Sequence, residues 1–120
     1  MEDFLYFVRT FVAKNRQERW IYLSTKKWEK FADFNGMEND FNENCILYEN
    51  NAEEIFFQTV QDKGINRGVY LEYWSGISIM SPIDWNQINK TSSCESLLIC
   101  KDEGVAFFFH HEGWIWVCKK

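Results

Sequence analysis

The sequence lacks most of the motifs that mark enzymes, nucleotide-binding proteins and membrane proteins. It has a single proline and six dispersed glycines, and it contains neither a glycine-rich phosphate loop nor the G-x-S-x-G turn of a serine hydrolase. No uncharged apolar run approaches the roughly 18 residues that a membrane-spanning helix needs. These absences exclude the common nucleotide-binding and hydrolase motifs, and they predict a protein that does not enter the membrane.

Cysteine is present, but without a recognisable pattern. The chain has four cysteines, which are Cys45, Cys94, Cys100 and Cys118. They form no C-x-x-C pair, their spacing matches no zinc signature, and three of them lie in apolar runs. Glu2 and Asp3 stand where a signal peptide carries positive charge. We therefore expect a cytoplasmic protein whose cysteines are reduced and pack as small apolar side chains.

Histidine is scarce as well, with a single adjacent pair at His110 and His111. Neighbouring residues of a strand point to opposite faces, so we expect this pair not to chelate one ion and to be exposed. An alternative is a small enzyme or ligand-binding domain with an aromatic cavity beneath its sheet, and with Cys100, His110 or a carboxylate at its mouth. The sequence predicts no metal ion and no other cofactor.

Aromatic residues are abundant, with 11 Phe, 6 Trp and 5 Tyr, and the hydrophobic content is 46%. A compact chain of 120 residues buries about two-thirds of the surface that its unfolded form exposes. Such a composition is not that of a disordered chain. No repeat or linker divides the sequence, so we predict one domain over residues 1–120. The aromatic residues are expected mostly in its core.

In the first half of the chain, helical spacing of apolar residues predicts an amphipathic helix over residues 4–12. Residues 19–23 are β-prone and fit either a short strand or a helix extension. Ser24 or Thr25 then caps a second helix, which carries Trp28, Phe31 and Phe34 on one face and ends at Gly36. Residues 37–44 are predicted as a loop.

The remaining pattern predicts an antiparallel sheet interrupted by helices. Residues 45–48 form a predicted strand. Asn50 or Asn51 then caps a predicted helix that extends through Asp62, and Gly64 terminates it. The alternative is that residues 55–61 form a strand. A short helix begins at Ser81–Pro82, and the other predicted strands are 68–74, 77–80, 97–101, 105–110 and 114–118. The fold class is therefore α+β, with N-terminal helices packed on an antiparallel sheet that ends in a three-strand meander.

Charge is distributed unevenly along the chain. Residues 1–30 carry seven basic and four acidic residues, and residues 63–120 carry six of each. Residues 31–62 carry eight acidic residues and no basic one, a balance of −8. This segment is either a solvated face that maintains solubility or a docking surface for a basic partner. An acidic chain repels polyanions, so nucleic acid is not the expected partner.

A small, acidic, aromatic-rich α+β chain without a catalytic motif resembles the immunity proteins of bacterial toxin–immunity pairs. The resemblance is one of general character, and it rests on size, on the aromatic strands and on the acidic segment Asp33–Asp62. It implies a tight complex with a cognate toxin, often a cationic nuclease, whose phosphate-binding site is covered by acidic side chains without any reaction being catalysed.

The docking hypothesis assigns partner binding to six acidic residues, as charge partners for Lys or Arg, and to one aromatic anchor. These are Glu38, Asp40, Glu43, Glu49, Glu53, Glu54 and Trp85. A rival interpretation within the same class is a phage-encoded inhibitor of a host protein, or a subunit of a larger complex.

Overall fold

The computed structural model describes residues 2–26, 36–72, 76–90 and 95–120. The α-helices in these ranges are α1 (Glu2–Phe11), α2 (Gln17–Lys26), α4 (Ala52–Lys63) and α5 (Trp85–Lys90). Short 3-10 helices are η1 (Lys14–Arg16), η2 (Met37–Asp40) and η3 (Lys101–Glu103). The strands are β1 (Cys45–Tyr48), β2 (Gly68–Glu72), β3 (Gly76–Met80), β4 (Ser96–Cys100), β5 (Val105–Phe109) and β6 (Ile115–Lys119).

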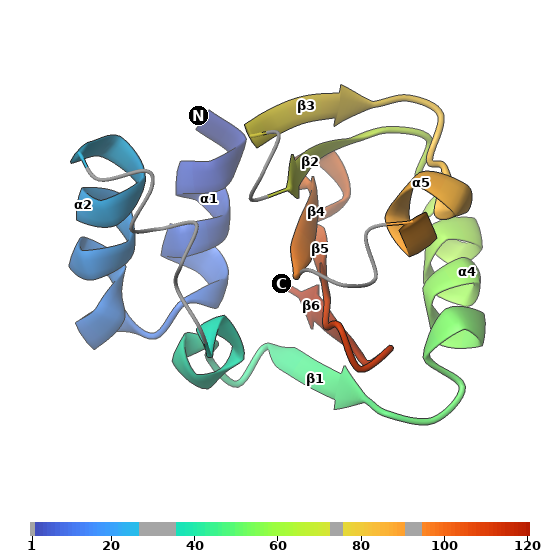
Figure 1. The fold of residues 1–120 in the computed structure, drawn as a ribbon, viewed down its shortest axis with the longest axis horizontal. Coiled ribbons are helices and arrows are strands. Elements are labelled where there is room, and N and C mark those ends of the chain that lie inside the picture. Colours follow the sequence, from blue (N-terminus) through green and yellow to red (C-terminus); the bar gives the residue numbers. More distant parts are fainter. Residues whose placement is uncertain (1, 27–35, 73–75, 91–94) are drawn as a thin grey trace.

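The strands form one sheet in the order β1-β6-β5-β4-β2-β3, and every neighbouring pair is antiparallel. Helices α1 and α2 lie on one side of the sheet, and α4 and α5 lie on the other (Figure 1). The α+β class and the C-terminal meander of β4, β5 and β6 are thereby confirmed. Helices α4 and α5 form the second helical layer, so the fold has three layers with the sheet in the middle.

The centre of the sheet is buried on both faces, and β5 shows this most clearly. All five residues of β5 are buried. Phe108 belongs to the core under α1, whereas Phe107 packs edge-on against Phe56 of α4 at 4.8 Å between ring centroids. A strand covered on both sides needs apolar residues at every position. This explains the unbroken Val105–Phe109 run in the sequence.

The N-terminal helices follow the sequence pattern with one choice resolved. The predicted helix 4–12 is confirmed as α1, and residues 19–23 lie inside α2, so the strand option for them is wrong. Trp20 is fully buried against Phe4 and Phe7 of α1, and this packing favours the helix over local β propensity. The residues Trp28, Phe31 and Phe34 of the predicted second helix lie outside the described residues. Its predicted start is wrong, because Ser24 and Thr25 lie inside α2 rather than at a helix N-terminus.

In the middle of the chain, the predicted helix after Asn50 or Asn51 is confirmed as α4, and the predicted loop needs correction. The predicted loop 37–44 contains the 3-10 helix η2, and residues 55–61 belong to α4, so the strand alternative is wrong. Gly64 ends α4 in a left-handed conformation, with φ of 62°, as a C-terminal glycine commonly does.

Helix α5 begins later than the sequence indicates. It starts at Trp85 rather than at Pro82. The carboxylate of Asp84 accepts hydrogen bonds from the backbone N–H groups of Asn86, at 3.0 Å, and Gln87, at 3.4 Å. Asp84 therefore caps the helix, and a side-chain cap that satisfies free N–H groups fixes the start more strongly than proline does.

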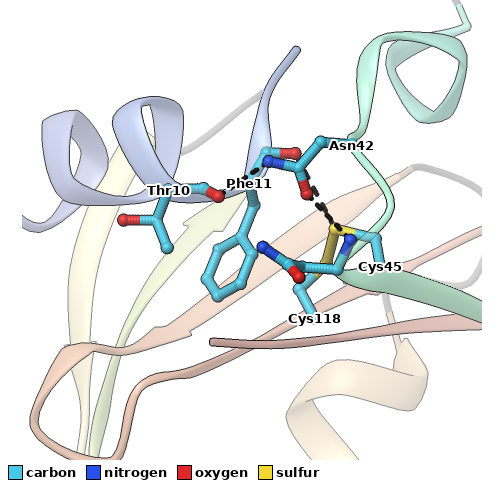
Figure 2. The surroundings of a disulfide bond; sticks show 6 residues. Thr10, Phe11, Asn42, Cys45 and Cys118 are labelled. Carbon is cyan, nitrogen blue, oxygen red and sulfur yellow. Dashed lines mark hydrogen bonds between the residues drawn. A yellow bond between two sulfur atoms is a disulfide. The ribbon is translucent and has the colours of Figure 1, made fainter. Parts of the chain in front are cut away.

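The largest departure from expectation concerns the cysteines. Cys45 and Cys118 are register partners on β1 and β6 and form a disulfide (Figure 2). The prediction that they are reduced is wrong for this structure. Asn42 fixes the chain just before β1, since its side chain donates to the Thr10 carbonyl at 2.8 Å and its backbone N–H donates to the Phe11 carbonyl at 2.8 Å. The disulfide therefore joins the last strand to a segment already bound to α1.

Gly68 offers a test of packing between β2 and β4. A Cβ at this position would lie 2.8 Å from Leu98 Cδ1 and 3.0 Å from the Ile99 carbonyl oxygen. Because the backbone cannot move away, we expect Gly68→Ala to lower the free energy of unfolding by about 2 kcal/mol. Urea denaturation measures it. The neighbouring exposed change Arg67→Ala is the control, and we expect it to shift stability by no more than about 0.5 kcal/mol. Equal stability of the two variants would contradict this packing.

Candidate functional site

Three of the predicted partner-binding residues come together where β1 leads into α4. Glu49 follows β1, and Glu53 and Glu54 occupy the first turn of α4; we call these three residues the α4 acidic cluster. All three are exposed, and within the described ranges none of them forms an ion pair. Acidic side chains in a first helical turn interact favourably with the helix dipole, but Glu49 lies outside the helix and has no such role.

Glu43 is also exposed and lies before β1, at the opposite end of that strand from Glu49. In the part of the chain that the structure describes, it too lacks an ion pair. Glu43 therefore extends the negative surface along the β1 edge rather than joining the α4 acidic cluster.

Asp40 has a different environment from the one expected for a charge partner. It is buried, with 8% of its surface exposed. Its carboxylate accepts hydrogen bonds from Trp20 Nε1 at 2.8 Å and from Arg16 Nε at 3.1 Å. Its charge is thus used inside the chain, where it connects η2 to α2, and little of it faces a partner. Local sequence pattern does not reveal these hydrogen bonds, because the partners are 20 and 24 residues away.

The aromatic anchor Trp85 lies in a shallow groove between α4 and α5. It is half-buried, and its ring contacts Phe56 at 5.1 Å and Phe57 at 5.4 Å between centroids. Phe57 is 45% exposed and lines the same groove. Glu53 precedes Phe57 by four residues, so the two share one face of α4. An exposed aromatic side chain therefore stands one helical turn from the α4 acidic cluster.

The two histidines lie elsewhere, and they lie together. The predicted separation on opposite faces is wrong because β5 ends at Phe109, and the backbone turns at His110. The imidazole rings stack at 4.2 Å between centroids, and the His110 ring also stacks on Trp114 at 4.9 Å. His111 Nδ1 lies 3.2 Å from a carboxylate oxygen of Glu95, a residue that the sequence analysis did not single out.

Glu38 is the sixth predicted acid, and it joins the histidines rather than the exposed surface. Its side chain is half-buried, and Oε1 lies 3.9 Å from His110 Nε2. Its other oxygen, Oε2, is buried and has no hydrogen-bond partner in the described part of the chain. Glu38, Glu95, His110 and His111 form what we call the histidine–glutamate cluster. Within the described ranges, Glu95, His110 and His111 are close enough together to hold a metal ion, and Glu38 lies beside His110.

The alternative of a catalytic Cys–His pair finds no support in this geometry. Cys100 pairs with Val105 at one end of the β4–β5 ladder, whereas His110 follows Phe109 at the other end. Burial, and secondarily the nearby Glu103 carboxylate, raise the pKa of the Cys100 thiol to about 12. A thiol of that pKa is a poor source of thiolate at neutral pH. Phe107 and Phe108 of β5 are fully buried on opposite faces of the sheet, each in the core on its own side.

Comparison with family models, with curated proteins and with solved structures gave no match to this chain. Among the described helices, none combines the length and apolar character needed to cross a bilayer.

Proposed function

We propose that this chain is a non-enzymatic protein-binding module that binds a basic protein through the α4 acidic cluster, with the groove of Phe57 and Trp85 as an apolar anchor. The observation that carries the proposal is the exposure of Glu49, Glu53 and Glu54 without an ion pair in the described chain. Carboxylates in this state keep their full field for an approaching cation.

The apolar part of the surface supports the same proposal. Interfaces combine a buried aromatic centre with a polar rim, and Trp is among the side chains that contribute most to binding. Phe57 and Trp85 supply such a centre, and Glu53 lies one helical turn from Phe57 on α4. The charged rim accelerates association and selects a basic partner, while the aromatic pair slows dissociation.

The finer proposal is that the partner is a cognate toxin and that the chain is its immunity protein. A toxin that acts on nucleic acid has a cationic surface for phosphates, and a surface such as the α4 acidic cluster complements it. Inhibition then follows from covering that cationic surface, without any chemical step.

Partner capture from the source cell tests this proposal. The wild-type chain serves as one bait, and Glu49→Lys/Glu53→Lys/Glu54→Lys serves as the second. A third bait, Glu18→Lys/Asp62→Lys/Asp102→Lys, has the same net charge as the second but alters exposed acids elsewhere. We expect the first and third baits to retain one basic protein and the second to lose it, because only the second reverses the binding field. Mass spectrometry identifies the captured protein.

Growth of cells that express the captured protein separates immunity from other binding. We expect that protein to arrest growth alone, the wild-type chain to restore growth, and the α4 variant to fail. Equal capture by all three baits would contradict the acidic-surface proposal. Capture without growth arrest would instead favour the inhibitor or subunit interpretation.

A cytoplasmic location belongs to this proposal and has its own test, because the cytosol keeps thiols reduced. Alkylation of thiols in intact cells, followed by peptide mass spectrometry, reports the state of Cys45 and Cys118. Alkylated peptides accord with the cytoplasm, whereas a linked peptide places the chain in an oxidising compartment.

A further inference from the structure

The histidine–glutamate cluster brings together metal-ligand side chains from three separate segments. Glu38 comes from η2, Glu95 directly precedes β4, and His110 and His111 follow β5. One ligand atom each of Glu95, His110 and His111 can be chosen so that all three lie within 4.8 Å of one another. The β4–β5 register produces this arrangement, because Ser96 pairs with Phe109 and so places Glu95 opposite His110.

The distances are close to those of a tetrahedral metal site. With metal–ligand bonds of about 2.0–2.2 Å, neighbouring ligand atoms lie about 3.3 Å apart. The His111 Nδ1–Glu95 Oε1 distance is 3.2 Å. His110 Nε2 lies 3.9 Å from Glu38 Oε1 and 4.0 Å from Glu95 Oε1, so these side chains must move closer together to share one ion.

In the described part of the chain, the two carboxylates of the cluster face the imidazoles rather than a lysine or an arginine. No lysine or arginine within the described ranges forms an ion pair with Glu38 or Glu95. Glu38 Oε2 is buried without a hydrogen bond there, and the His110 side chain is only 10% exposed, with its Nε2 beyond hydrogen-bond distance of either carboxylate. Buried carboxylates are stable when they are paired or coordinate a metal ion, and a divalent ion at this site would serve both Glu38 and Glu95.

His111 is oriented as metal-bound histidines are. Its Nδ1 faces Glu95, and its Nε2 lies 3.5 Å from the carboxylate of Glu112. A metal-bound histidine commonly donates its other N–H to a carboxylate, which fixes the ring and raises its basicity. Glu112 stands in that position.

We propose that Glu38, Glu95, His110 and His111 bind one divalent transition-metal ion of the zinc class. Imidazole nitrogens with carboxylate oxygens suit zinc and similar ions better than magnesium or calcium, which prefer oxygen ligands alone. The ion links η2, the start of β4 and the turn after β5, so its role is structural. The site is separate from the α4 acidic cluster, and the two proposals stand or fall independently.

Zinc titration by calorimetry, on protein freed of metal by a chelator, measures the site. We expect saturable binding of one Zn²⁺ per chain and no comparable heat from Mg²⁺. His111→Ala and Glu95→Gln should each weaken zinc binding at least about tenfold, whereas Glu43→Gln, which alters an exposed carboxylate outside the cluster, should bind zinc as wild type does. Circular dichroism checks that each variant is folded. The absence of zinc binding by the wild type, or equal affinity in all variants, would overturn the proposal.

A second readout follows from the hydrogen bond between the Glu112 backbone N–H and His110 Nδ1, at 3.1 Å. Because Nδ1 accepts, neutral His110 carries its proton on Nε2 in this arrangement. Coordination through Nε2 moves the proton to Nδ1 and breaks the bond to Glu112. Nitrogen NMR of the imidazole rings should therefore show the His110 tautomer change on addition of zinc. An unchanged tautomer at saturating zinc would exclude His110 Nε2 as a ligand.

Discussion

Replacing both disulfide cysteines, as in Cys45→Ala/Cys118→Ala, should lower the free energy of unfolding by about 4 kcal/mol. The bond closes a loop with a sequence separation of 73 residues, and a link across a loop of that length restricts the unfolded chain strongly. It also holds β1, an edge strand paired only with β6, to the rest of the sheet. We expect β1 to separate from β6 first when the bond is absent.

Urea denaturation with and without a reducing agent measures this effect. The reductant should lower the unfolding midpoint of the wild type and leave that of the double alanine variant unchanged. Cys100→Ala, which alters a buried cysteine outside the disulfide, is the control and should keep the sensitivity to reductant. A wild-type midpoint that is the same in both conditions would mean that the disulfide contributes nothing to stability.

Asp40→Ala should lower the free energy of unfolding by about 3 kcal/mol. The change removes the carboxylate that accepts from Trp20 Nε1 and Arg16 Nε. It removes the charged acceptor of the buried Trp20 N–H, and hydrogen bonds to charged groups contribute about 1.5–3 kcal/mol. Denaturation followed by tryptophan fluorescence is the measurement.

Two further variants test whether the stability effect is specific to the buried carboxylate of Asp40. Asp40→Asn keeps an acceptor for Trp20 and should recover part of the lost stability, whereas Glu43→Ala should change stability by no more than about 0.5 kcal/mol. Neither Asp40→Asn nor Glu43→Ala should unfold the chain. If Asp40→Ala were as stable as Glu43→Ala, the buried hydrogen-bond network would not contribute to stability as described.

Local sequence pattern predicted the elements whose structure depends on nearby residues. The meander β4–β5–β6 follows from three apolar runs separated by glycine-containing turns, and α1 follows from helical spacing. The choice between helix and strand for residues 55–61 was open because Ile, Phe, Thr and Val favour strands. Phe56 packs on the sheet against Phe107 and Phe109, and this packing favours the helix. A contact between residues so far apart in the sequence cannot be predicted from neighbouring residues alone.

The candidate sites divide in the same way. Exposure of Glu49, Glu53 and Glu54 accords with a local pattern of charge at a helix start. The hydrogen bond between Asp40 and Trp20 joins residues 20 positions apart, and the Cys45–Cys118 bond joins residues 73 positions apart. Sequence spacing could therefore not predict either contact. Neighbouring side chains point to opposite faces only inside a strand, and β5 ends at Phe109, just before the two histidines. This is why the prediction for His110 and His111 was wrong. Glu95 joins them only through the register of β4 on β5.

The rate at which the captured basic partner associates with this chain tests the central claim most directly. Exposed charges steer association, and salt screens them over about 8–10 Å near physiological ionic strength. We predict that Glu49→Lys/Glu53→Lys/Glu54→Lys slows association about tenfold or more at low salt, and that the difference from wild type shrinks as salt is added. The charge-matched variant Glu18→Lys/Asp62→Lys/Asp102→Lys should associate nearly as fast as wild type. Equal rates for the two charge-matched variants would contradict the account, because binding would then not depend on the α4 acidic cluster.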